Sequence, residues 1–145
     1  MKSFLHSILI GCALLLTSLS LFSQTTDLII SEYGEGSSWN KYIEIYNGTG
    51  ADIDLTGYYI EIAFDGDPWN DPTNNTINLS NTLTDGDVYI ICHTSANATI
   101  QANADIITGS LSFNGNDAVG LFSLASIIDV VGNVGENPGT GWYVA

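Results

Sequence analysis

Basic residues are almost missing from this sequence. Two Lys or Arg residues stand against 16 Asp or Glu residues, and the formal net charge is −14 at pH 7. Affinity for phosphate backbones comes mainly from Lys and Arg, so we expect no nucleic-acid partner and no docking on an anionic membrane surface. The chain is not a disordered acidic tail either, because 45% of its residues are hydrophobic.

Cysteine and histidine are equally scarce, with two of each. Cys12 and His6 fall in the N-terminal leader described below, which leaves Cys92 and His93 for the rest of the chain. A lone Cys forms no internal disulfide and is typical of a small buried residue. A lone His has no second His with which to relay protons or bind zinc. Cys92 and His93 are adjacent, and adjacent residues on a strand point to opposite faces, so these two side chains cannot share one catalytic pocket. We therefore predict a non-enzymatic protein, with His93 as a surface residue at a strand end.

Helical periodicity is absent from the sequence as well. Apolar residues instead alternate with a period of two, which is typical of half-buried strands in antiparallel sheets. Dipeptides that favour turns, such as Asn47-Gly48 and Asp85-Gly86, separate these runs. Many short strands with frequent turns predict an all-β sandwich or barrel. The clearest alternating runs are residues 42–46, 58–64, 88–93, 111–113, 119–121 and 128–130.

The N-terminus has the pattern of a signal peptide. A short start with Lys2 is followed by a mostly apolar run over residues 4–22, and a polar stretch opens at Ser23. We predict a signal peptide over residues 1–23, cleaved before Gln24 or before Leu21, and a mature domain over residues 24–145. The alternative is a transmembrane anchor, but the run is barely long enough to span a bilayer and no basic stop follows it. We therefore expect a secreted or cell-surface protein with no integral membrane segment after cleavage.

Several short motifs resemble the lamin tail domain family, and they occur in the family's order over nearly the whole mature chain. The resemblance implies an immunoglobulin-like antiparallel β-sandwich, in agreement with the period-two pattern. The motifs are DLIISEY at residues 27–33, KYIEIYN at 41–47, DIDLTGY at 52–58, LTDGDVYI at 83–90, FNGNDAV at 113–119, DVVG at 129–132 and NPGT at 137–140.

The resemblance also implies a function. The family occurs in nuclear lamins and in exported bacterial proteins, often beside nucleases, phosphatases or adhesive modules. It therefore predicts a non-catalytic attachment or interaction module, an accessory domain whose partner is a protein or a cell-surface glycan. Relatives continue beyond the point that corresponds to Ala145 with a closing strand. We thus expect a sandwich that lacks its C-terminal closing strand, either as a fragment of a longer exported protein, which we favour, or completed by a partner's strand.

One acidic loop is a candidate cation site. Asp65, Asp67 and Asp71, with the amide oxygen of Asn70, place oxygen ligands within seven residues. Calcium prefers six to eight such oxygens, so these three carboxylates are predicted Ca²⁺ ligands. The alternative is turn chemistry, because Asp, Asn and Gly are turn residues whatever the function.

Two tryptophans are candidates for ligand binding. Trp39 and Trp69 fall in predicted loops beside polar residues, and Asn70 follows the second directly. An aromatic face beside carboxylates and amides is suited to a sugar, which stacks through its apolar face and forms hydrogen bonds at its rim. The alternative is that these rings fold back over the edge of the sandwich. The second function predicted from sequence is therefore a carbohydrate-binding domain, either with or without a dependence on calcium.

Overall fold

The computed structural model describes residues 25–142 and is built almost entirely of strands. The only helix of this part of the chain is one turn long and capped by the side chain of Asn97, which accepts from the backbone of Ile100 at 3.0 Å. The elements are β1 (Ile29–Glu35), β2 (Lys41–Tyr46), β3 (Ile53–Asp54), β4 (Tyr58–Ala63), β5 (Asn75–Asn78), β6 (Thr82–Leu83), β7 (Val88–His93), α2 (Ala98–Gln101), β8 (Ile106–Thr108), β9 (Ala118–Ser123) and β10 (Ser126–Val131).

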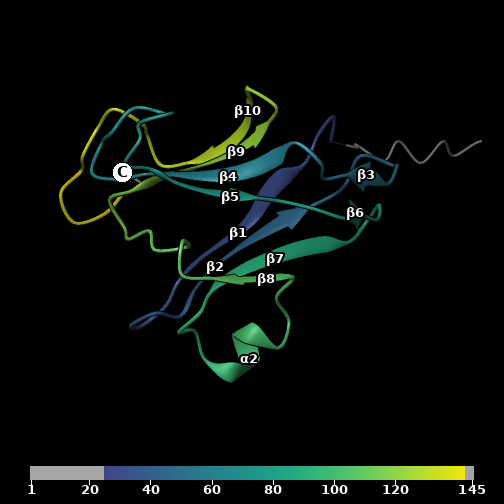
Figure 1. Ribbon diagram of the computed structural model, residues 1–145, viewed down its shortest axis with the longest axis horizontal. Coiled ribbons are helices and arrows are strands. Elements are labelled where there is room, and N and C mark those ends of the chain that lie inside the picture. The colour runs from purple at the N-terminus through teal and green to yellow at the C-terminus, as the bar shows by residue number, and fades with distance from the viewer. Residues whose placement is uncertain (1–24, 143–145) are drawn as a thin grey trace, which may run out of the picture.

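Two four-stranded sheets face each other across the core (Figure 1). One has the strand order β1-β2-β7-β8 and the other has the order β10-β9-β4-β5, while β3 and β6 form a small separate ladder. The antiparallel β-sandwich predicted from the sequence is confirmed. One pair differs, because β8 runs parallel to β7. Parallel neighbours need a crossover connection, and the segment that carries α2 provides it.

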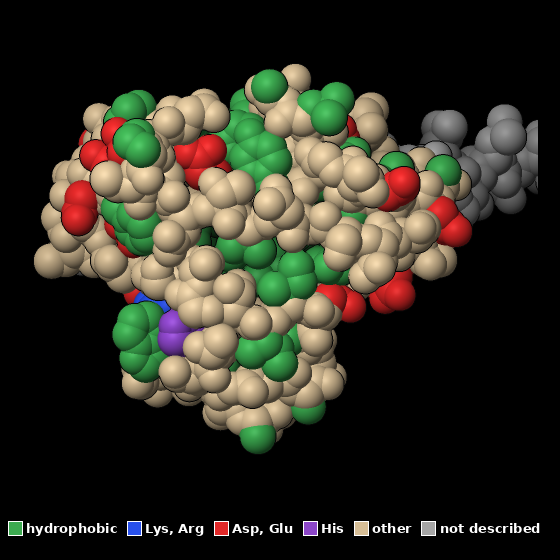
Figure 2. All heavy atoms as spheres, viewed as in Figure 1, with side chains coloured by type: hydrophobic (Ala, Val, Ile, Leu, Met, Phe, Trp, Pro, Cys, Tyr) green, Lys and Arg blue, Asp and Glu red, His purple; other side chains and the backbone are tan. Residues whose placement is uncertain are grey.

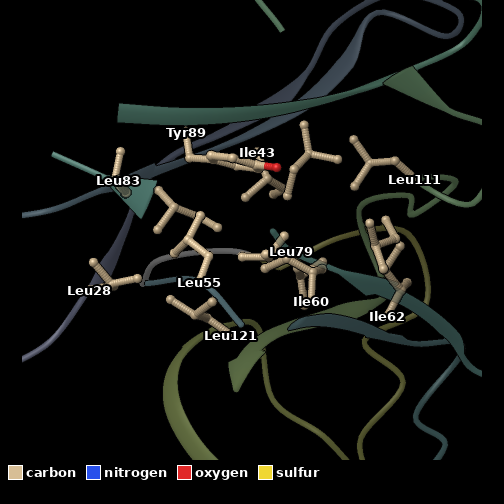
Figure 3. Close-up of a cluster of buried hydrophobic side chains, with 14 of the residues drawn as sticks. Leu28, Ile43, Leu55, Ile60, Ile62, Leu79, Leu83, Tyr89, Leu111 and Leu121 are labelled. Atoms are coloured by element: carbon tan, nitrogen blue, oxygen red, sulfur yellow. The ribbon is translucent and has the colours of Figure 1, made fainter. Parts of the chain in front are cut away.

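Aliphatic side chains from the inner faces of both sheets fill the space between them (Figure 3). Ile43 and Ile45 come from β2, and Ile60 and Ile62 come from β4; all four are fully buried. Burying one such side chain stabilises the fold by about 1.5–3 kcal/mol relative to exposure. The period-two pattern of the sequence therefore identifies the residues of β2 and β4 that point into the core.

The segment around Phe113 departs from the strand expected at residues 111–113. Leu111 and Phe113 are fully buried, as the alternation requires. However, the segment pairs with no strand, and the backbone N–H of Ser112 donates to the carbonyl of Ser110 at 3.0 Å within a turn. The expectation of a strand here is wrong. Alternating apolar residues indicate which side chains are buried, whereas a strand also needs a neighbouring strand with which its backbone forms hydrogen bonds.

A carboxylate closes one corner of the sandwich. Asp129 in β10 accepts from the backbone N–H of Ile30 in β1 at 2.8 Å through Oδ2. The ladders of both strands shift register beside these residues, between Ile30 and Glu32 and between Ile127 and Asp129. The side chain thus joins the edge strands of the two sheets.

The predicted signal peptide over residues 1–23 lies outside the described residues. Across residues 25–142, no helix has the length and apolar character needed to cross a bilayer.

Candidate functional site

A groove of about 410 Å³ lies on the outer face of the sheet formed by β4 and β5. The alternation that turns Ile60 and Ile62 into the core turns Tyr59 and Glu61 outward. The loop after β4 folds back beside these side chains, and it bends where Asp65 and Asn70 take positive φ values of 49° and 65°. Asp and Asn tolerate this conformation better than other non-glycine residues. We call this hollow the Glu61 groove; its lining residues are Tyr59, Glu61, Asn70, Asp71, Pro72, Asn74 and Thr76.

A buried hydrogen-bond network lies beneath the floor of the groove. Glu61 is only 2% exposed, and its Oε1 accepts from the backbone N–H of Asn70 at 2.6 Å and from Nδ2 of Asn74 at 2.7 Å. The same amide nitrogen of Asn74 donates to the carbonyl of Pro68 at 2.9 Å. Oδ1 of Asn74 is buried and has no partner among the described residues. Both acceptors are therefore shielded from solvent beneath the groove.

An aromatic stack forms one wall of the Glu61 groove. The ring of Tyr59 lies parallel to that of Phe122 on the neighbouring strand, with centroids 4.9 Å apart and an interplanar angle of 3°. Trp69 packs edge-on against the same Phe122 ring at 5.4 Å. Burial and then the charge of Glu61 raise the pKa of the Tyr59 phenol above its ordinary value. The phenol therefore stays protonated at neutral pH and can donate a hydrogen bond.

Trp69 buttresses this wall and does not line the groove. Its indole lies over Gly120, where an added Cβ would come within 3.1 Å of the ring. The aromatic side chain that lines the groove is therefore Tyr59, and Asn70 lines the groove as well.

The three candidate calcium ligands are not brought together. Thr73 lies between two of them, because its hydroxyl is 2.6 Å from Oδ1 of Asp71 and 3.2 Å from Oδ2 of Asp67. Asp65 turns away and accepts from Nδ2 of Asn116 at 2.6 Å and from Nδ2 of Asn137 at 3.1 Å. Within residues 25–142, no group of three or more His, Cys, Asp or Glu side chains is placed to hold a metal ion. Calcium binding by this loop stays a prediction.

Thr73 also tunes one of these carboxylates. Its hydroxyl and then its backbone N–H donate to Asp71, and they hold the pKa of that carboxyl below its ordinary value. Asp71 is therefore ionised at neutral pH at the rim of the groove.

Trp39 lies at a different place in the fold. It follows β1 and stacks on His93 at the end of β7, with ring centroids 4.3 Å apart and an interplanar angle of 16°. His93 is 7% exposed, and its Nδ1 accepts from the backbone N–H of Ser95 at 3.0 Å. The expectation that His93 is a surface residue is wrong, because the loop between β1 and β2 brings a tryptophan over it. Trp39 and Trp69 thus pack against different sheets.

A buried carboxylate anchors the loop of the Glu61 groove. Asp117 is fully buried, and it accepts from the backbone N–H of Asp65 at 3.0 Å and from the backbone N–H of Asn114 at 2.8 Å. Burial raises its pKa above the ordinary value. Asp117 and Asn114 belong to the FNGNDAV motif, so this motif holds the first residue of the loop in place.

The sequence alone did not identify Tyr59, Glu61, Asn74 or Thr76 as site residues. The available signal was the alternation of β4, which places Tyr59 and Glu61 on the face opposite the core. That signal was incomplete, because only the folded loop covers Glu61 and turns an exposed strand face into a groove.

The two facing sheets place the chain in the class of antiparallel β-sandwich domains. The chain belongs to the lamin tail domain family, because residues 22–135 match the model for the Lamin Tail Domain. This match confirms the resemblance drawn from the sequence motifs and the immunoglobulin-like sandwich that it implied. The family consists of immunoglobulin-like interaction domains that are generally non-enzymatic, which is consistent with a non-catalytic module. No curated protein matches the chain with significance.

Proposed function

We propose that this protein is a secreted, non-catalytic attachment module that binds glycans in the Glu61 groove. The pair of buried acceptors beneath the groove is the observation that carries the proposal. Glu61 is buried with its carboxylate beneath the floor, and the neighbouring Oδ1 of Asn74 has no partner among the described residues. A buried acceptor left unpaired costs about 1–3 kcal/mol, so a small movement of the loop that lets a sugar hydroxyl donate to Oδ1 of Asn74 would be favoured.

The walls of the groove complement a sugar ring. Tyr59 offers an aromatic face to the C–H face of a sugar, and Asn70, Asp71 and Thr76 offer polar groups at the rim. The partner would be a cell-surface or extracellular glycan, carried on a cell wall or on another protein. Such a domain fits an accessory role in a larger exported protein.

Secretion is proposed from the leader. The apolar run over residues 4–22 supports export followed by cleavage before Gln24 or Leu21. N-terminal sequencing of protein recovered from the culture medium tests this directly. Material that begins at Met1 would contradict cleavage.

Affinity electrophoresis tests glycan binding. The mature protein is run in native gels cast with soluble xylan, mannan or mixed-linkage β-glucan, and retardation by at least one polysaccharide is expected. Asn70→Gly removes the amide but tolerates the positive φ, and it should weaken binding roughly two- to tenfold, which is the value of one hydrogen bond. Tyr59→Ala removes the aromatic wall and should weaken binding at least as much.

Trp39→Ala is the matched control, because Trp39 packs on the end of the other sheet. It should leave retardation unchanged. If Trp39→Ala abolishes binding while the two groove variants bind normally, the site lies elsewhere. If no polysaccharide retards the wild type, glycan binding itself is contradicted.

A further inference from the structure

A second groove lies on the outer face of the other sheet. It has a volume of about 280 Å³ and is lined by residues of β1, β2 and β7 and by residues of the α2 segment. Its exposed lining is mainly apolar. We call it the α2 groove; its lining residues are Glu32, Tyr42, Glu44, Ile90, Thr99, Ile100 and Asn103.

The carboxylates of the α2 groove form a like-charge pair. Glu32 and Glu44 are directly opposite each other in the β1–β2 ladder, and Ile90 is the partner of Glu44 on β7. Like charges at directly opposed positions destabilise a sheet. Each carboxylate receives one neutral donor, the Tyr42 hydroxyl to Glu32 and the Ser31 hydroxyl to Glu44, both at 2.8 Å.

No cation in the described part of the chain offsets this pair. The one ion pair found among residues 25–142 joins Lys41 to Glu35 at 3.1 Å, and Lys41 is only 7% exposed. A second copy of the described domain therefore presents no exposed base to this groove.

The apolar lining and the negative charge of the α2 groove together indicate which kind of side chain it can bind. The ring of Tyr42 and the side chains of Ile90 and Ile100 offer an apolar surface, and two carboxylates lie at one side of it. A long aliphatic stem that ends in a positive charge complements both parts. We propose that the α2 groove binds an Arg or Lys side chain of an extended basic segment in a partner protein. The stem lies on the apolar surface and the cationic head lies at Glu32 and Glu44.

The surroundings of the groove favour a segment over a free amine. Asp105, which is exposed, accepts from the backbone N–H of Ile90 at 2.8 Å and adds a third carboxylate beside the groove. The side chain of Ile107 on the nearby β8 is 46% exposed. Residues that flank the bound Arg or Lys would therefore find both charged and apolar surface. This binding is independent of the glycan proposal, because the two grooves lie on different sheets.

Fluorescence anisotropy with a defined peptide tests the proposal. The probe is a fluorescein-labelled Gly-Ser peptide with a Leu-Arg-Leu centre, and a Leu-Gln-Leu peptide is its neutral counterpart. The Arg peptide should bind at least about tenfold more tightly, since a hydrogen-bonded charged group contributes about 1.5–3 kcal/mol. Glu44→Gln should weaken binding of the Arg peptide about tenfold, whereas Glu136→Gln, which makes the same charge change at a distant exposed site, should change it less than twofold.

The melting temperature separates loss of the site from loss of the fold. Glu44→Gln removes the like-charge pair, so its melting temperature should equal or exceed that of the wild type. If Glu44→Gln weakens binding and also lowers the melting temperature, the assignment of Glu32 and Glu44 as a repulsive pair that binds the cation is contradicted. An equal loss of affinity for the Arg peptide in Glu44→Gln and Glu136→Gln would mean that the peptide is attracted by the overall negative charge. That result would also contradict the assignment of Glu32 and Glu44. If spermidine or Ca²⁺ displaces the peptide at matched ionic strength, the occupant is a small cation and the peptide proposal is wrong.

Discussion

Single buried polar side chains organise the loops of this domain. Asn47 is fully buried; its Nδ2 donates to the carbonyls of Ala51 at 2.8 Å and Leu83 at 2.9 Å, and its Oδ1 accepts from the backbone N–H and hydroxyl of Thr49. Only an amide supplies donors and acceptors together in this way. The Asn47-Gly48-Thr49 sequence has the pattern of a glycosylation acceptor, but here the Asn47 side chain stabilises the turn through its hydrogen bonds.

His93 provides a pH-dependent test at the residue scale. Burial, and then the charge of Lys41, lower its pKa below the ordinary value of 6.5. Between the lowered folded pKa and 6.5, the unfolded chain binds a proton that the folded chain does not. Stability is therefore complete above about pH 6.5 and falls as the pH drops below it, by at most about 1.4 kcal/mol per pH unit for one proton.

Urea unfolding of the wild type and of His93→Gln at pH 7.5 and 5.5 measures this effect. The wild type should lose more free energy of unfolding between the two values than the variant does. Parallel losses in the two proteins would show that other groups carry the pH dependence.

At the scale of elements, the hydrophobic pattern predicted the strands well where a strand has one face in the core. The alternation around Ile43, Ile60, Ile91 and Leu121 corresponds to β2, β4, β7 and β9. It did not predict that β8 runs parallel to β7. Strand direction depends on the path of the connection, and a one-turn helix leaves no helical period to read.

The candidate site was predicted in part for a related reason. The loop residues Asn70 and Asp71 do line the Glu61 groove. Tyr59 and Glu61 were not predicted, because an outward position on a strand has the same sequence pattern whether it faces solvent or a folded loop. Composition also could not separate Asp65 from Asp67 and Asp71, which the fold turns toward different partners.

The loop at residues 65–71 gives the test of calcium binding. If the ion binds Asp65, Asp67 and Asp71, it must draw Asp65 away from its amide partners and relieve repulsion among the carboxylates. Calcium should then raise the melting temperature, with a gain of about 2.7 kcal/mol at a hundredfold excess over the dissociation constant. Asp67→Asn should remove the part of this gain that is specific to calcium.

Controls must separate this gain from simple charge screening. Magnesium, and sodium at matched ionic strength, give the screening contribution for an acidic surface. Asp87→Asn makes the same charge change at an exposed residue whose carboxylate accepts from the backbone N–H of Val88 at 2.9 Å. If wild type, Asp67→Asn and Asp87→Asn respond alike, the loop carries turn residues and is not a metal site.

At the scale of the whole molecule, most acidic side chains of the described residues are at least partly exposed, Glu61 and Asp117 being the buried exceptions, whereas Lys41 is buried. Red acidic side chains lie at several places over the upper part of the face in Figure 2, and blue surface is confined to one small area. Lys41 is the base of the described part, and its ammonium is held by Glu35 and lies 5.4 Å from the centroid of the Phe113 ring. The two grooves lie on the outer faces of opposite sheets, so one domain could hold two partners at once.

This distribution gives a prediction for nucleic acids. Sequence-independent affinity for DNA requires exposed Lys or Arg that release counterions from phosphates, and the described surface presents none. The acidic field should repel phosphates over the whole surface. We expect no change in the anisotropy of a labelled DNA duplex, without divalent ions, at protein concentrations well above micromolar. The same preparation should bind the Arg peptide, which shows that it is folded and active. A salt-sensitive micromolar complex with the duplex would contradict this expectation, because only an exposed basic surface could produce it.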